Sequence, residues 1–105
     1  MRYRIVKKFD GGLVHAVYSL VNGWIEDFRL TGDFFFYPEE KLFLLEKELV
    51  GKKITELKTT IISFYDKHGI ESPGVTPWEL AQAIIHAVPM KDGDEWEDKD
   101  EAEEH

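Results

Sequence analysis

The spacing of apolar residues changes once along the chain, and this change predicts strands first and helices afterwards. Residues 13–21 place Val14, Ala16, Tyr18 and Leu20 on every second position, which is the period of a strand. Residues 3–9 and 24–30 predict shorter strands on either side. Asn22-Gly23 lies between two apolar runs, and such a pair favours a type I′ hairpin turn.

The third predicted strand, residues 24–30, does not keep a single phase. Ile25 is out of step with Phe28 and Leu30. One extra residue in a strand switches the face to which the following side chains point. We therefore expect a β-bulge near Glu26-Asp27.

Three segments with helical spacing follow the strands, within residues 38–51, 54–69 and 76–88. Gly51, Gly69 and Pro89 are expected to end them, and Glu39-Glu40 to lie in the first turn of the first helix. The apolar stripes expected to face the core are Leu42, Leu45 and Leu49; Ile54, Leu57, Ile61 and Phe64; and Leu80, Ile84, Ala87 and Val88.

The third helix has the clearest start. Thr76 is expected to be the N-cap, Pro77 the first helical residue and Glu79 the partner of Thr76 in a capping box. Strands followed by helices predict an α+β domain, with a three-stranded antiparallel sheet and three helices packed on one side.

Composition and charge divide the chain into two parts. Its 105 residues are enough for one small domain, which we place at residues 1–90. Residues 91–105 hold nine acids and two lysines, a net charge of −7, whereas residues 1–90 hold twelve acids and eleven bases. We expect residues 91–105 to be a disordered acidic tail and the domain to be nearly neutral, with no basic face for nucleic acid.

Other classes of protein are disfavoured by what the sequence lacks. There is no cysteine, which excludes disulfides, thiolate metal sites and cysteine nucleophiles and fits a reducing compartment. No apolar run reaches the roughly 20 residues of a membrane helix. The N-terminal residues do not resemble a signal peptide, so we expect a cytoplasmic location.

No group of residues predicts catalysis or metal binding. His15, His68, His86 and His105 are scattered without ligand spacing, and we expect His15 and His86 to be exposed or half-buried. No glycine-rich phosphate loop is present, and no serine has an adjacent histidine that could act as a base. The sequence therefore predicts neither catalytic residues nor a metal site.

The segment "TGDFFF", residues 31–36, with Tyr37 after it, is the least expected feature of the chain. In one interpretation Gly32 relaxes the end of the strand, Asp33 caps a turn or helix, and alternate rings wedge the helices onto the sheet. In the other, at least one ring faces a partner, because contiguous exposed apolar surface marks interaction sites. Both interpretations can hold together.

In its setting the segment resembles the C-terminal accessory domain of lipoate–protein ligases. The resemblance covers about residues 3–88 and rests on a glycine hairpin followed by an isoleucine, a strand ending in "TGDFF", Pro-Glu-Glu, and a leucine-rich helix ending in "LVG". "TPWELAQAI" also resembles the last helix of that family. The matching residues are Gly12, Leu13, Gly23, Ile25, Leu30, Thr31, Gly32, Asp33, Phe34, Phe35, Pro38, Glu39, Leu45, Leu49 and Gly51.

The resemblance implies a fold similar to iron–sulfur scaffold proteins and the role of a non-catalytic subunit in a two-chain ligase. The complex would use ATP, Mg and lipoate to form lipoyl-AMP and would pass the lipoyl group to an acceptor domain. The catalytic residues would lie on the larger partner, and this chain would bind no cofactor itself. Thr31, Gly32, Asp33, Phe34 and Phe35 are the expected binding residues, toward the partner or near the adenylate site.

Two other interpretations remain open at this stage. The chain could be a protein-interaction module unrelated to lipoate, which uses the aromatic cluster and the tail. A scaffold related to iron–sulfur proteins is the least supported, because cysteine is absent. The acidic tail could aid solubility, or it could dock on a basic surface of a catalytic subunit with Trp96 as an anchor.

Overall fold

The computed structural model has a four-stranded antiparallel sheet in the order β3-β2-β1-β4, one strand more than the sequence predicts. Its strands are β1 Arg2–Phe9, β2 Gly12–Val21, β3 Trp24–Phe34 and β4 Val88–Pro89. The structure describes residues 1–90, so the predicted acidic tail, residues 91–105, lies outside the described residues.

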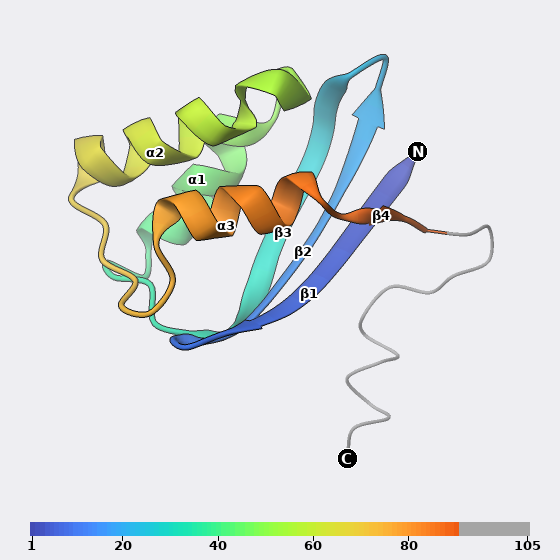
Figure 1. Cartoon of the computed structure of the whole chain (residues 1–105). Helices are drawn as coiled ribbons and strands as arrows, with labels where there is room; N and C mark the ends of the chain where they lie inside the picture. The colour runs from blue at the N-terminus through green and yellow to red at the C-terminus, as the bar shows by residue number, and fades with distance from the viewer. Residues whose placement is uncertain (91–105) are drawn as a thin grey trace.

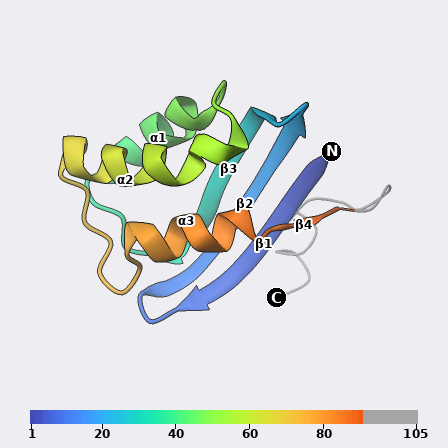
Figure 2. The same ribbon diagram turned by 45° about the horizontal axis from the view of Figure 1, so that its top comes forward.

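Three helices lie on one side of the sheet, as Figures 1 and 2 show. They are α1 Lys41–Leu49, α2 Leu57–His68 and α3 Pro77–Ile85, with the short 3-10 helix η1 Ile54–Glu56 directly before α2. The predicted α+β class, with an antiparallel sheet and three helices, is confirmed.

The hairpin between β2 and β3 forms as the sequence predicts. Asn22 and Gly23 both have positive φ, 53° and 86°, as a type I′ turn requires. The register between the strands shifts after Ser19, which pairs with Asp27, because Leu20 pairs with Ile25. Glu26 is therefore the extra residue of a bulge, and the predicted position of the bulge is confirmed.

The predicted helix caps are also present. Thr76 Oγ1 accepts a hydrogen bond from the Glu79 N–H at 3.1 Å, and Glu79 Oε1 accepts one from the Thr76 N–H at 3.0 Å. Gly69 ends α2 in the left-handed conformation with φ of 61°. Local sequence chemistry therefore determines both helix ends.

The prediction for the end of α3 was wrong. The helix stops at Ile85, and Val88 and Pro89 pair with Arg4 and Tyr3 as the edge strand β4. Val88 is consequently 61% exposed instead of lining the buried side of a helix. A proline is compatible with this position, because an edge strand leaves one side of its backbone unpaired.

Two smaller predictions also need correction. Helix α1 begins at Lys41, so Glu39 and Glu40 precede its first turn, with Glu40 as the N-cap residue. His15 is buried, with 8% of its surface exposed, because it lies in the central strand β2 and accepts a hydrogen bond from Arg4 Nε at 3.2 Å.

The core lies between the sheet and the helices and includes a buried polar contact. The Tyr18 hydroxyl donates a hydrogen bond to the Ile84 carbonyl at 2.9 Å, which joins β2 to α3. The Tyr18 ring stacks between Tyr3 and Phe28. The same core contains fully buried aliphatic side chains: Ile25, Leu30, Leu45, Leu49, Leu57, Ile61 and Leu80.

Ionisation of Tyr18 is expected to weaken the fold at alkaline pH. Burial, with a smaller contribution from Tyr3, raises the pKa of Tyr18 to about 12, whereas an exposed tyrosine ionises near pH ~10. This contribution to the free energy of unfolding is complete below pH ~10 and is lost as the pH rises toward the folded pKa of about 12. Urea denaturation followed by circular dichroism, from neutral pH to about pH 11, should show the decline.

The Tyr18→Phe variant tests the assignment. It should lose about 1 kcal/mol at neutral pH through the missing hydrogen bond, and it should decline less steeply above pH ~10. Tyr37→Phe is the matched control, because Tyr37 is 55% exposed and its replacement should leave the decline unchanged. An equally steep decline in Tyr18→Phe would show that another group is responsible.

Candidate functional site at the end of strand β3

The aromatic run after Gly32 alternates between the core and solvent. Phe36 is buried and meets Phe34 and Tyr65 edge to face, with ring centroids 6.3 and 5.8 Å apart. Phe35 and Tyr37 are 52% and 55% exposed and stack on each other at 5.9 Å. One pair of rings therefore fixes the strand to α2, and the other presents a flat aromatic surface to solvent.

A groove of about 380 Å³ runs beside this segment. Strand β3 and the residues after it form one wall, and Glu39 and Leu42 form the other. Its lining residues are Leu30, Thr31, Gly32, Phe34, Phe35, Phe36, Glu39 and Leu42. A mainly apolar groove with three aromatic rings and one carboxylate suits an apolar group that carries a hydrogen-bond donor.

The groove lies where the outer edge of β3 loses its cover. Earlier in the strand, Ile25 exchanges backbone hydrogen bonds with Gly51 and Lys52. The Leu30 N–H then donates to Glu46 Oε2 of α1 at 2.7 Å. Within residues 1–90, no backbone bond to this edge follows until Tyr37 pairs with Glu71, so the intervening segment is an open strand edge.

Four of the five residues predicted to bind a partner line this groove: Thr31, Gly32, Phe34 and Phe35. Asp33 is not among the residues that line it, and it pairs with Leu13 of β2. The prediction that Asp33 caps a turn or helix was wrong. Strand β3 continues to Phe34, and the N-cap of α1 is Glu40.

Gly32 has a structural role that explains its place in the motif. Its φ is 138°, and a Cβ at this position would overlap the Leu13 carbonyl of β2. Gly12, paired with Phe34, has φ of 127° and would overlap the Asp33 carbonyl in the same way. These two glycines allow the backbones of β2 and β3 to approach closely where the groove begins.

Sequence reasoning missed the helical side of the site. Glu46 and Leu42 are four residues apart on α1 and therefore share one face of the helix. A glutamate that continues the apolar stripe of Leu42, Leu45 and Leu49 is the signal that could have identified it. Its carboxylate ends the covered part of the β3 edge, and Leu42 lies in the groove.

The described residues, 1–90, contain no group of three histidine, aspartate or glutamate side chains that could hold a metal ion. No helix of this part of the chain is long and apolar enough to cross a membrane. The groove itself offers an exposed ring stacked on its neighbour, an open strand edge and the Glu39 carboxylate.

Comparison with known proteins shows the family to which this chain belongs. The family profile described as the bacterial lipoate protein ligase C-terminus matches residues 1–84. This chain belongs to that family. It is 34% identical over 84 residues to the lipoate-protein ligase A subunit 2 of Thermoplasma acidophilum, which covers 80% of this chain and 88% of the relative.

A solved structure agrees with the family assignment. The present chain is similar to one chain in the structure of a bi-partite lipoate protein ligase and its E2 lipoyl domain from Thermoplasma acidophilum. The TM-score is 0.77 and the sequence identity is 33%. The match covers 84% of this chain and 98% of the other chain. The similarity therefore extends over nearly the whole length of that chain.

The close approach at Gly32 should make this glycine irreplaceable for folding. Gly32→Ala is expected to lower the free energy of unfolding by at least about 3 kcal/mol, because a backbone overlap adds to the cost of an unfavourable φ. Gly23→Ala is the control: its φ is also positive, but no atom lies within 4 Å of the added Cβ. Its cost should stay near 1–2 kcal/mol. Equal costs in urea titrations of both variants would contradict the close-approach argument.

Proposed function

We propose that this protein is the non-catalytic accessory subunit of a two-chain lipoate–protein ligase. The observation that carries the proposal is the family match over residues 1–84, together with coverage of nearly the whole length of a small chain from a bi-partite ligase structure. The catalytic subunit would contain the adenylation site. This chain would be needed for the ATP-dependent step that converts lipoate to lipoyl-AMP.

The chemistry of the described residues supports this division of labour. Within residues 1–90, buried polar side chains are few, and Tyr18, His15, Ser19 and Ser72 all have hydrogen-bond partners inside the domain. Of the exposed aromatic side chains, Phe35 and Tyr37 stack on each other beside β3, and Phe35 also lines the groove. A subunit that acts by contact needs such a surface, since aromatic side chains dominate the energetic centres of interfaces.

We assign the groove as the contact with the catalytic subunit. Thr31, Gly32, Phe34 and Phe35 would meet it directly, and the open edge of β3 could pair with an extended segment of the partner. ATP, Mg and lipoate would be bound by the complex and not by this chain alone. The lipoyl acceptor domain would be an indirect partner, reached through the catalytic subunit in the cytoplasm.

Reconstitution tests the proposal. A catalytic ligase chain without a C-terminal domain is mixed with this protein, ATP, Mg²⁺ and lipoate, and lipoyl-AMP is measured by chromatography. We expect product to form only when both chains are present. The catalytic chain alone should still transfer the lipoyl group from preformed lipoyl-AMP to an acceptor domain, which shows that it is folded. Transfer without any stimulation of adenylation by this protein would refute the accessory role.

Replacement of Phe35 tests the proposed interface most directly, because its ring is exposed and lines the groove. Phe35→Ala should weaken binding to the catalytic chain by about 10-fold or more, because truncating an aromatic residue at the energetic centre of an interface costs about 2 kcal/mol or more. Titration calorimetry measures the affinity, and the adenylation assay should show the same loss at limiting protein. Phe34→Ala is less informative, since Phe34 also contacts buried Phe36 and its loss would destabilise the fold.

Trp24→Ala is the matched control for Phe35→Ala. Trp24 is 47% exposed on the same strand but lies at its opposite end, beside Lys53. Its replacement should leave affinity and adenylation unchanged. Equal binding by wild type and a folded Phe35→Ala variant would move the interface away from the groove without affecting the accessory role itself.

A further inference from the structure

Strand β1 has an outer edge that β4 covers only in part. β4 pairs with Tyr3 and Arg4, and the Met90 N–H donates to the Arg2 carbonyl at 2.8 Å. In the described part of the chain, no strand continues this pairing along residues 5–9. Figure 1 shows β4 beside the N-terminal half of β1. The sheet therefore has a second open edge, on the side opposite β3.

The direction of the backbone groups defines what this edge can bind. The Arg2 carbonyl faces outward, because it accepts the hydrogen bond from Met90. Backbone groups alternate in direction along a strand, so those of Val6 and Lys8 face outward as well. Among the described residues, neither has a hydrogen-bond partner on this side. The edge thus presents two N–H donors and two carbonyl acceptors at the spacing of an extended backbone.

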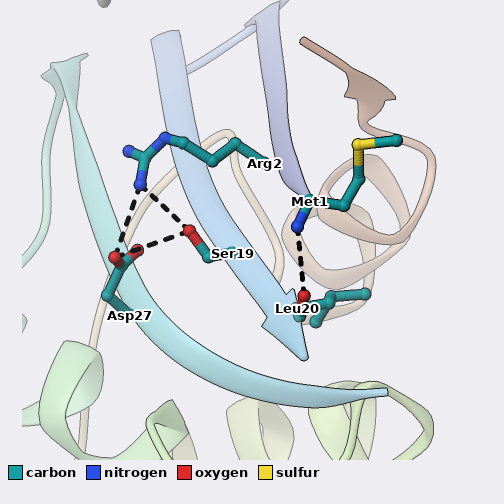
Figure 3. Close-up of polar contacts among 5 residues, drawn as sticks. All are labelled: Met1, Arg2, Ser19, Leu20 and Asp27. Carbon is teal, nitrogen blue, oxygen red and sulfur yellow. Dashed lines mark hydrogen bonds and ion pairs between the residues drawn. The ribbon is translucent and has the colours of Figure 1, made fainter. Parts of the chain in front are cut away.

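Contacts with the other strands hold β1 in place, so its edge is formed before any further strand is added. All eight residues of β1 pair with β2. Figure 3 shows the contacts at its start, where Arg2 Nη1 donates to Ser19 Oγ at 2.9 Å and lies 3.4 Å from Asp27 Oδ2. The Met1 amino group also donates to the Leu20 carbonyl, at 3.3 Å.

A groove of about 470 Å³ lies between β1 and α3, beside the open edge. Ile5, Phe9 and Ala83 give it an apolar lining, and Lys7 Nζ lies 5.7 Å from the centroid of the Phe9 ring. The polar residues on its α3 side are Glu79, Gln82 and His86. Because alternate side chains of paired strands share a face, a residue added opposite Lys7 would point into this groove.

Charge distinguishes between a second copy of this chain and a different partner. Lys7 and Lys8 are exposed, and neither has an ion pair among the described residues. Antiparallel pairing of two copies about the centre of residues 5–9 would set Lys7 opposite Lys7 of the second copy. Like charges that lie opposite each other destabilise a sheet, and edge lysines oppose such self-pairing. A carboxylate opposite Lys8 would instead form a favourable cross-strand pair.

We propose that the outer edge of β1, along residues 5–9, binds an extended acidic segment of another protein as an additional strand. The backbone of the segment would bond to Val6 and Lys8. An apolar side chain opposite Lys7 would fill the groove beside α3, and a carboxylate on the preceding residue would face Lys8. This edge and the groove at β3 lie on opposite sides of the sheet, so the inference does not depend on the proposed role in lipoylation.

A short peptide tests the site. The probe is acetyl-Thr-Glu-Leu-Val-Thr-amide, whose Glu, Leu and Val would lie opposite Lys8, Lys7 and Val6. It is titrated at low salt into the ¹⁵N-labelled full chain. We expect saturable changes in the amide signals of Val6 and Lys8, with slower hydrogen exchange there and little change at residues 31–36. Replacement of the peptide Glu by Lys should weaken binding about 5-fold.

Methylation of single peptide nitrogens separates strand pairing from charge attraction. The N–H of the peptide Val would donate to the Val6 carbonyl, so N-methylation of this residue should weaken binding about 5-fold or more. The N–H of the peptide Leu would point away from β1. N-methylation of the Leu is therefore the matched control and should weaken binding much less.

Charge variants of the full chain complete the test. Lys8→Glu should reverse the preference, so that the peptide with Lys binds more tightly than the peptide with Glu. Lys47→Glu makes the same charge change at an exposed position of α1 and should keep the preference. An unchanged preference in Lys8→Glu, equal effects of the two methylations, signal changes centred on residues 31–36 or no binding would each overturn the proposal. Without peptide, signals of Val6 and Lys8 that depend on protein concentration would overturn it in favour of a second copy.

Discussion

The structure depends on one constraint: three short helices can cover only one face of a four-stranded sheet. All side chains that need burial against helices must therefore lie on one row of each strand. Tyr18 marks the centre of that row, because its ring packs among aromatics and its hydroxyl satisfies the Ile84 carbonyl near the end of α3. Every other feature of the sheet either serves this row or is left for contacts outside the core.

The bulge and the two close glycines follow from that constraint. If β3 alternated regularly, without the bulge at Glu26, Ile25 would face away from the helices when Phe28 and Leu30 face toward them. At the other end of β3, Gly32 lets the strand continue beside β2 for two more residues. The continuation places Phe34 on the core side, and the aromatic run then alternates between core and solvent. The groove is thus a consequence of how the last strand ends.

Local chemistry explains which parts of this architecture could be predicted from sequence. The hairpin at Asn22-Gly23, the bulge and the capping box at Thr76 each depend on a few neighbouring residues, and all three were predicted correctly. Strand β4 was missed because two residues have no period, and Val88 enters the sheet only through pairing with β1, about 85 residues away in sequence. Burial of His15 was missed for a similar reason, since it depends on the neighbouring strands and on Arg4.

The groove was only half visible in the sequence. The glycine and aromatic residues form one contiguous segment, whereas the opposite wall comes from Glu39 and Leu42, and Glu46 fixes where the strand edge opens. In the sequence Glu39 and Glu46 could not be told from ordinary helix residues. Their positions beside β3 depend on the packing of α1 against that strand. The same packing determines where the groove begins. The Glu46 side chain of α1 accepts a hydrogen bond from the Leu30 N–H, and among the described residues α1 bonds no backbone group of β3 beyond this residue. An edge that is bonded as far as Leu30 and flanked by stacked rings restricts the register in which an extended segment could pair with it.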